Sequence, residues 1–205
     1  MQLVQFLQQG GIFMYPILIV MAIGIAISIE RFIYLQKTVG ATNKIWKQLT
    51  PMLKANDFER AQQLLANSLT PLARVLSYGF ARYKGNASRE RIEAAMEEGV
   101  MEVTSEIDER THYLATLANV STLIGLFGTV AGLIEAFAAV AGADPAEKAE
   151  LLTASISVAM NSTALGLGCA IPLLLIHSYL ATKASKLLDT IEMAAVKCLN
   201  LLVDE

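Results

Sequence analysis

Small and hydroxyl-bearing side chains recur along two long apolar runs of this sequence. In the first run, residues 113–141, they follow three- and four-residue spacings and are Ser121, Thr122, Gly125, Gly128, Thr129 and Gly132. In the second run, residues 151–182, they are Ser155, Ala159, Ser162 and Gly166, beside Asn161 and Thr163. Residues three and four apart share one face of a helix. Each run therefore predicts a helix with one small, polar stripe.

Two explanations of the stripes are open. Small residues let helices approach closely in lipid, with each hydroxyl bonded to its own helix one turn back. Alternatively, the stripes line a polar, partly hydrated lumen. Thr129 and Thr163 would both lie near mid-membrane if the two runs are antiparallel across a short loop. Three helices of one chain cannot enclose a pore, so the lumen requires an oligomer.

Glu135 is the one carboxylate inside these two runs. A charged group in the bilayer is costly and usually faces a bundle interior or water, which makes Glu135 a functional candidate. It also lies near the expected outer end of its run, where an interfacial carboxylate in contact with water is the alternative. His177 is either an interfacial ring or a proton relay. Pro172 removes a backbone donor and should bend the second run near Gly168.

The composition indicates that much of the chain faces lipid. Of 205 residues, 54% are hydrophobic and 17% are charged, and the mean hydropathy is +0.47. Soluble chains average about 25% charged residues. Three mainly apolar runs, residues 11–35, 113–141 and 151–182, are long enough to cross a bilayer core of about 30 Å. The expected fold class is an all-α membrane protein with three transmembrane helices and long helical extensions.

The distribution of basic residues predicts the sidedness of the chain. Of 16 Lys and Arg residues, only Lys148 lies in the loop at 142–150, and none precedes the first run. Segments rich in Lys and Arg stay in the cytoplasm. We therefore expect residues 1–10 and the loop 142–150 in the periplasm, and residues 36–112 and 183–205 in the cytoplasm.

Residues 36–112 are expected to form helical hairpins. Asp57 is a candidate N-cap for a helix that ends near Asn67, and Pro71 can begin a helix that runs to about Tyr83. These short helices would precede a longer one.

Ser88 can cap this longer helix. Apolar and small residues recur after it at three- and four-residue spacing, and they are Ile92, Ala95, Gly99, Val103 and Ile107. No helix breaker separates this segment from the apolar run at 113–141. One uninterrupted helix from Ser88 to about Ala141 is predicted.

Other chemistries have no signature in the sequence. Cys169 and Cys198 are too far apart on one helix for a disulfide, and the sequence lacks a CxxC motif and clustered histidines. Residues 36–112 contain no nucleophile–base pair or phosphate loop. A net charge of −3 gives no basis for nucleic-acid binding. We expect no metal, no cofactor, no nucleic-acid partner and no enzymatic activity.

Three segments resemble the MotA/TolQ/ExbB proton channel family, most closely its three-span ExbB and TolQ branch. They are Glu30-Arg31 after the first run, residues 123–130 (Leu-Ile-Gly-Leu-Phe-Gly-Thr-Val) with Gly132, and residues 162–167 (Ser-Thr-Ala-Leu-Gly-Leu) followed by Ala170-Ile171-Pro172. Together with the order of spans, loop and stalk, the resemblance covers nearly the whole chain. The first glycine-threonine motif is specific, and the second reinforces it.

The resemblance implies a motor complex in the bacterial inner membrane. Family members form a pentamer around two single-span chains of the ExbD/TolR type, and that partner supplies the aspartate that takes up protons. Thr129 and Thr163 match the threonines that face this aspartate. The further candidates for the pathway or pore lining are Ser162, Asn161 and Glu135, and those for helix packing are Gly125, Gly128, Gly132, Gly166 and Pro172. Proton flow would drive rotation and transmit force to a TonB- or TolA-like protein.

One position departs from the family pattern. ExbB and TolQ often carry a glutamate five residues before the second threonine, where this sequence has Val158. The proton route does not need that acid, or Glu135 and Asn161 take over part of its role, or the coupling ion has changed. A four-span MotA-like stator is disfavoured because the chain lacks a fourth apolar run. A non-conducting membrane scaffold, or a related ion-driven stator for another envelope task, is the alternative function.

Overall fold

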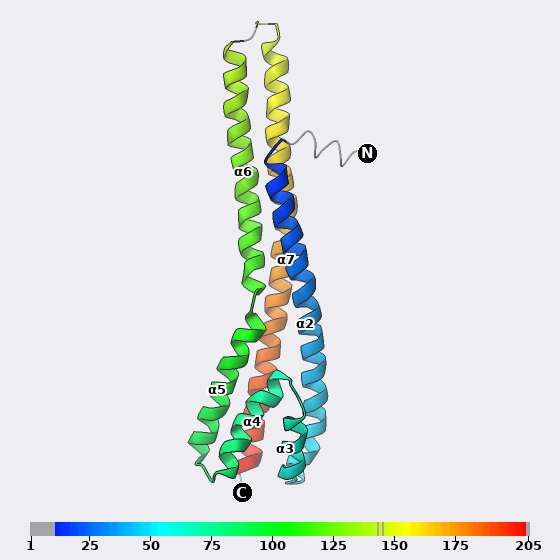
Figure 1. The fold of residues 1–205 in the computed structure, drawn as a ribbon, viewed down its shortest axis with the longest axis vertical. Coiled ribbons are helices and arrows are strands. Elements are labelled where there is room, and N and C mark those ends of the chain that lie inside the picture. The colour runs from blue at the N-terminus through cyan, green and yellow to red at the C-terminus, as the bar shows by residue number, and fades with distance from the viewer. Residues whose placement is uncertain (1–10, 143, 145, 204–205) are drawn as a thin grey trace. The chain divides into compact units, whose positions relative to one another are not determined.

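The computed structural model describes residues 11–142, 144 and 146–203, and every regular element in this part of the chain is an α-helix (Figure 1). The helices are α2 (Met14–Lys54), α3 (Phe58–Ala66), α4 (Pro71–Lys84), α5 (Arg89–Asp108), α6 (Thr111–Ala141) and α7 (Lys148–Val203). Three stretches are long and apolar enough to cross a membrane: α2, the α5–α6 stretch Arg89–Ala141, and α7. The predicted all-α fold with three candidate spans is confirmed. The segment 1–10, expected in the periplasm, lies outside the described residues.

The chain divides into two compact units. Unit 1 combines Met1–Glu30 with Arg110–Ser178, and unit 2 combines Arg31–Glu109 with Tyr179–Glu205. Unit 1 therefore contains the first part of α2, all of α6 and the first part of α7. Unit 2 contains α3, α4 and α5 together with the remaining parts of α2 and α7.

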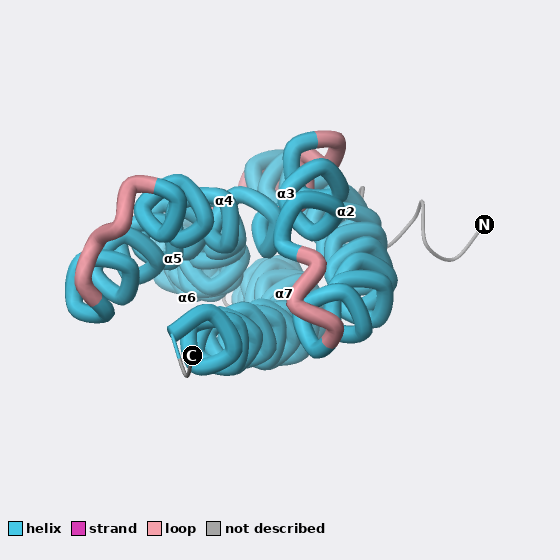
Figure 2. Tube along the Cα trace, turned by 90° about the horizontal axis from the view of Figure 1, so that it is seen from below, coloured by secondary structure: helices cyan, strands magenta, loops and turns pink. Residues whose placement is uncertain are grey.

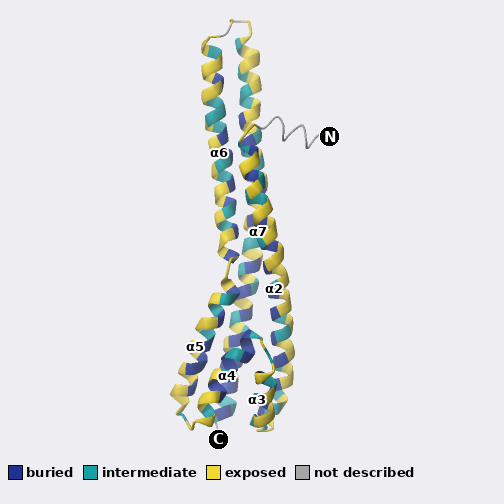
Figure 3. Ribbon diagram, in the orientation of Figure 1, coloured by how far each residue is buried: buried dark blue, intermediate teal, exposed yellow. Residues whose placement is uncertain are grey.

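Unit 1 buries many small residues and exposes many large apolar ones, although Met14, Ile17, Leu114 and Leu173 are buried (Figure 3). Its buried small residues include Ala118, Ser121, Gly125, Gly128, Ala159, Ser162 and Gly166. Its exposed large residues include Ile23, Leu123, Leu126, Phe127, Ile134 and Leu175. A soluble chain rarely exposes so much contiguous apolar surface, whereas a membrane-spanning bundle presents it to lipid.

Unit 2 has a hydrophobic core of large side chains. Its fully buried members include Leu49 and Leu53 of α2, Leu72, Leu76 and Phe80 of α4, and Ile92 and Ile107 of α5. Helix α4 packs against both α3 and α5. The five residues whose spacing predicted the inner face of α5 are all buried, as expected.

The helix starts in unit 2 follow their sequence signals. Asp57 caps α3, and its side chain accepts a hydrogen bond from the backbone N–H of Arg60 at 3.3 Å. Helix α4 begins at Pro71 as predicted, whereas Ser88 stands at the N-cap of α5 without a capping hydrogen bond from its side chain. Thr70, which the sequence reading missed, caps α4 from the preceding position. Local chemistry therefore determines where these helices begin.

The prediction of an uninterrupted helix over residues 88–141 is wrong. Helices α5 and α6 are separated at Arg110, which has a positive φ of 62°. In unit 2, the guanidinium of Arg31 donates to the carbonyl oxygen of Glu106 at 3.4 Å and to that of Ile107. These are carbonyls at the C-terminal end of α5, which a continuing helix would have bonded to its own next turn. A side chain distant in sequence, rather than a local breaker, therefore caps the end of α5.

The other two long helices extend beyond the expected spans. Helix α2 begins at Met14 and continues past residue 35 to Lys54. Helix α7 contains both the expected third span, residues 151–182, and most of the expected C-terminal helix, and it continues through Pro172.

Candidate functional site

Helices α6 and α7 bring Thr129 and Thr163 into direct contact within unit 1. Their hydroxyl groups form a hydrogen bond in which either group can donate. Thr163 Oγ1 also lies 2.9 Å from the carbonyl oxygen of Gly125 on the opposite helix. Thr129 Oγ1 lies 3.3 Å from that same oxygen and 3.2 Å from the carbonyl oxygen of Ala159. The two threonines are half-buried, and together they form the hydroxyl pair of unit 1.

The hydroxyl pair has fewer hydrogens than contacts. Each threonine hydroxyl carries one hydrogen and two acceptor lone pairs. The pair therefore has two hydrogens for three kinds of acceptor: the two carbonyl oxygens and the oxygen of the other hydroxyl. More than one donor arrangement satisfies these contacts. Such a pair can accept a hydrogen bond from an acid at one end and donate at the other, which is what a proton relay requires.

Glycines allow α6 and α7 to approach closely enough for this contact. A Cβ atom on Gly125 would lie 3.0 Å from the carbonyl oxygen of Ser162, and one on Gly166 would lie 2.8 Å from that of Ser121. The Ser121 hydroxyl donates to the carbonyl oxygen of Gly166 at 3.1 Å. Because the obstructing atoms are backbone, a larger residue at either glycine would force the helices apart.

Ser162 is buried between the same helices. A Cβ atom on Gly128 would lie 2.5 Å from Ser162 Oγ, and one on Gly132 would lie 2.9 Å from Ala159 Cβ. Ser162 is 1% exposed, and its hydroxyl has no hydrogen-bond partner among the described residues. A buried hydroxyl without a partner is costly. Ser162 directly precedes Thr163, so the polar atoms of the site extend one residue along α7.

The remaining expected site residues do not join the hydroxyl pair. Glu135 is exposed on α6, about 9 Å along the helix axis from Thr129. Asn161 is half-buried on α7, and Val158 is exposed. Pro172 is exposed inside α7. The structure thus brings the hydroxyls and glycines together and leaves the one carboxylate of the two runs apart from them.

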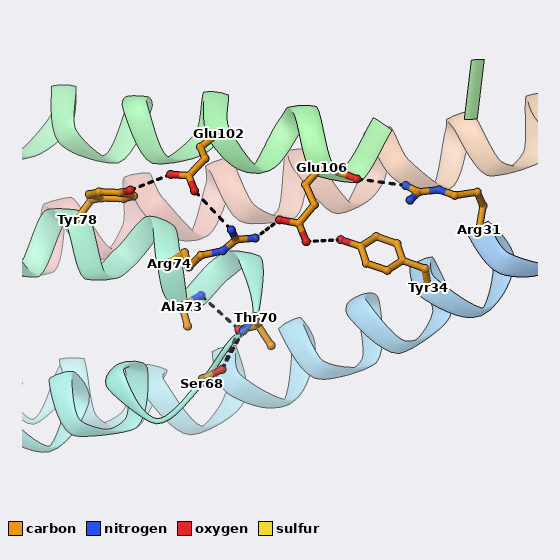
Figure 4. Close-up of polar contacts among 9 residues, drawn as sticks. All are labelled: Arg31, Tyr34, Ser68, Thr70, Ala73, Arg74, Tyr78, Glu102 and Glu106. Atoms are coloured by element: carbon orange, nitrogen blue, oxygen red, sulfur yellow. Dashed lines mark hydrogen bonds and ion pairs between the residues drawn. The ribbon is translucent and has the colours of Figure 1, made fainter. Parts of the chain in front are cut away.

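Unit 2 contains a polar network that the sequence reading missed (Figure 4). Glu106 of α5 accepts a hydrogen bond from the hydroxyl of Tyr34 at 2.9 Å and pairs with Arg74 of α4. Arg74 also contacts Glu102 at 3.4 Å, and the hydroxyl of Tyr78 donates to Glu102 at 2.8 Å. The network ties α2, α4 and α5 to one another.

The charges of this network shift its proton equilibria. The hydrogen bond from Arg74 lowers the pKa of Glu106, although partial burial opposes this shift. The same contact raises the pKa of Arg74, and the hydrogen bond to Glu102 raises the pKa of Tyr78. Glu106 therefore remains ionised at neutral pH, so the network is an ion-pair brace rather than a proton carrier.

Arg31 is the second residue of unit 2 whose role was missed. It is 2% exposed, and a buried guanidinium needs acceptors, which the end of α5 provides. The available signal was the charged dipeptide Glu30-Arg31 placed directly after an apolar run. A charge at that position requires either water or a partner, and the sequence does not identify the partner.

The fold and this site define a class of protein. Three helices of the described chain can each cross a membrane, and two of them carry contacting hydroxyls. Residues 67–193 match the MotA/TolQ/ExbB proton channel family, and the chain belongs to this family. It is a multi-pass membrane protein.

The relatives indicate the ExbB/TolQ branch. An ExbB homologue of Methanothermobacter thermautotrophicus is 29% identical over 195 residues, or 91% of this chain. The Tol-Pal system protein TolQ of Haemophilus influenzae is 39% identical over 79 residues, or 38% of this chain, and the biopolymer transport protein ExbB of Salmonella typhimurium is 31% identical over 113 residues, or 55%. The chain spans 65%, 34% and 46% of the lengths of these three relatives, respectively.

Proposed function

We propose that this chain is the ExbB/TolQ-type subunit of a proton-driven motor in the bacterial inner membrane. The observation that carries the proposal is the direct contact between the hydroxyls of Thr129 and Thr163 on two adjacent, membrane-capable helices. Membership of a proton channel family supports it. In this proposal, proton flow does work at the outer membrane through a TonB- or TolA-like protein.

A single-span partner of the ExbD/TolR type supplies the titrating acid. Threonine hydroxyls stay neutral near pH 7, so they can relay a proton but cannot store one. An aspartate of the partner that reaches the hydroxyl pair would donate its O–H to a lone pair of one threonine, and the other threonine would pass its own hydrogen to water in the hydrated lumen. Ser162 and Asn161 extend the polar surface along α7, and Glu135 provides an acid nearer the periplasm.

The proposed topology follows the basic residues. Residues 1–10 and the loop at 142–150 lie in the periplasm, and unit 2 lies in the cytoplasm, because the segments of unit 2 carry nearly all of the Lys and Arg. Five copies form a ring around the partner helices, as the resemblance implies. The ring supplies the enclosure that three helices of one chain cannot.

A non-conducting scaffold is the second candidate. The close approaches at Gly125 and Gly166, and the contact of Thr129 with the carbonyl oxygen of its own helix at 3.3 Å, fit ordinary packing. A scaffold needs small residues between α6 and α7 but no hydroxyl. The motor therefore requires the hydroxyl groups of Thr129 and Thr163, whereas the scaffold does not.

The test replaces each hydroxyl by a methyl group at nearly constant volume. We expect Thr129→Val and Thr163→Val, made separately at normal expression, each to abolish outer-membrane nutrient uptake or envelope integrity while the complex still assembles. Thr116→Val on α6 and Thr153→Val on α7 are matched controls, since these exposed threonines bond only to their own helix in the described structure. Full activity of both site variants would refute the proposal. A scaffold would tolerate them and fail only when Gly128 or Gly132 is enlarged.

A further inference from the structure

A row of lysines lies on the part of α2 that belongs to unit 2. This lysine face consists of Lys37, Gly40, Lys44, Lys47 and Lys54, all exposed. At about 100° per residue, they fall within an arc of about 100° on the side opposite the buried Leu35, Ile45 and Leu49. Residues 31–54 contain no acidic residue. Among the described residues, none of the four lysines forms an ion pair with a carboxylate.

Gly40 gives the lysine face a gap at its centre. A Cβ atom there would meet no other atom within 4 Å. Glycine inside a helix costs about 0.5–1 kcal/mol relative to alanine, and no contact within the described chain requires it here. The close approach of another chain is a reason for a helix to keep a glycine at this position.

A second surface of unit 2 has the opposite character. A groove of about 640 Å³ runs between α5 and the C-terminal part of α7. Its apolar lining includes Met101, Val196 and Leu199, and its acidic lining consists of Glu93, Glu97 and Glu192. Met101 is 72% exposed and Val196 is 56% exposed. None of the described residues that line this acidic groove is basic.

We propose that the lysine face of one copy of this chain docks into the acidic groove of the next copy. Lysine combines an apolar stem with a terminal ammonium group, so its stem can cover Met101 and Val196 while its charge meets the glutamates. The lysine face is about 26 Å long from Lys37 to Lys54, and its part from Lys37 to Lys47, about 15 Å, matches the span of about 16 Å from Glu93 to Thr104 along α5.

The placement of the two surfaces makes the contact head-to-tail. Within unit 2, α2 and α5 lie on opposite sides, with α4 between them (Figures 1 and 2). Each copy can therefore use its lysine face toward one neighbour and its acidic groove toward the other, and such a heterologous contact forms a ring when the rotation between copies closes. The inference rests on the proposed function in that it names the surfaces through which the proposed ring is held together.

The first test is disulfide crosslinking of the full chain in membranes. Gly40→Cys adds a side chain into open space, and Met101→Cys changes an exposed residue. The two natural cysteines, Cys169 and Cys198, are buried. We expect the double variant to give a ladder of dimers, trimers and larger species after mild oxidation, and each single variant to give none.

The second test exchanges the charges. Glu93→Lys with Glu97→Lys, and separately Lys44→Glu with Lys47→Glu, should each lower the yield of the ladder by about fivefold, as expected for the loss of two surface ion pairs. Combining all four changes should restore it. Glu59→Lys on α3, an exposed acid outside the groove, is the matched control.

The outcomes separate this inference from the proposed function. A ring that assembles without the crosslinked ladder, or charge reversals that lower the ladder and are not rescued in combination, would overturn the docking contact and leave the proton motor standing. Dimers from either single-cysteine variant would show a like-to-like contact and also overturn it. A ladder in a chain whose Thr129→Val and Thr163→Val variants stay active would support the docking contact and refute the motor. If the chain binds anionic vesicles through these lysines and gives no crosslinked ladder, the lysine face contacts lipid and not a second copy.

Discussion

Units 1 and 2 of this chain differ in the side chains that they bury and expose. In unit 1, helices approach closely at glycine and serine, and many isoleucine, leucine and phenylalanine side chains are exposed, although Ile17, Leu114 and Leu173 are buried. In unit 2, large aliphatic side chains fill the interior, and arginine and glutamate brace the outside. Lipid gives no drive to bury large apolar side chains, whereas water does. The two regions therefore fit two different environments, lipid and water, and the hydroxyl pair lies beside the close approaches at Gly125 and Gly166.

The largest effect is expected from enlarging a glycine in unit 1. Gly166→Leu places its side chain against the carbonyl oxygen of Ser121 and should separate α6 from α7, with loss of the assembled complex on gel filtration. Gly168→Leu, two positions along the same helix, meets open space and should assemble normally. Equal behaviour of the two variants would contradict the backbone contact.

A smaller effect is expected from removing the charged cap in unit 2. Arg31→Met leaves the last carbonyls of α5 without their donor and should destabilise the chain by about 1–3 kcal/mol. At about 2–4 °C per kcal/mol for a chain of this size, the Tm of the purified protein would fall by about 2–12 °C. Arg60→Met, at a highly exposed position, should change the Tm little. Equal Tm values for Arg31→Met and Arg60→Met would contradict the role of Arg31 as the cap of α5.

Gly79 of unit 2 offers a direct comparison with Gly166, because the atoms next to Gly79 belong to a side chain that can move. A Cβ atom on Gly79 would clash with the Met96 side chain, at its terminal methyl and at Cγ 2.8 Å away, but not with backbone. Gly79→Ala should therefore cost only about 1 kcal/mol. The variant should keep its oligomeric state and lose about 2–4 °C in Tm. A loss as severe as that of Gly166→Leu would remove the distinction between the two units.

The smallest effect is a pH dependence of unit 2. Because Arg74 lowers the pKa of Glu106 in the folded state, the stabilisation from this pair is complete above the unfolded pKa of about 4.3 and is lost as the pH falls below it. Thermal melts from pH 6 down to pH 3 should show this loss. Glu106→Gln and Arg74→Met should each remove this component of the profile, and an unchanged profile in both would exclude the pair as its source.

Much of the fold follows from patterns within single segments. The three apolar runs predicted the three membrane-capable helices, and Asp57 and Pro71 predicted where α3 and α4 begin. The small residues of α6 that formed the predicted stripe lie against α7, as the packing explanation of that stripe requires, because close helix contact in lipid needs small side chains. These features depend on local sequence or on a single helix face, which is why one sequence was enough.

The missed features depend on pairs of residues far apart in the chain. The end of α5 depends on Arg31, and the network of unit 2 joins Tyr34 to Glu106. No helix-breaking residue between 88 and 141 predicts the end of α5, because the capping side chain, Arg31, belongs to α2. Thr129 and Thr163 were expected only to face the same central cavity. Their hydrogen bond depends on the register of α6 against α7, which the sequence alone does not give.

The left-handed backbone at Arg110 has a consequence for how this chain could change shape. An L-residue in that conformation costs about 1–2 kcal/mol relative to a helical one. Straightening it would recover that energy and let α5 run on into α6, but only by giving up the bonds from Arg31 to Glu106 and Ile107. The two backbone arrangements at Arg110 therefore differ by these bonds, and Arg31 favours the left-handed one.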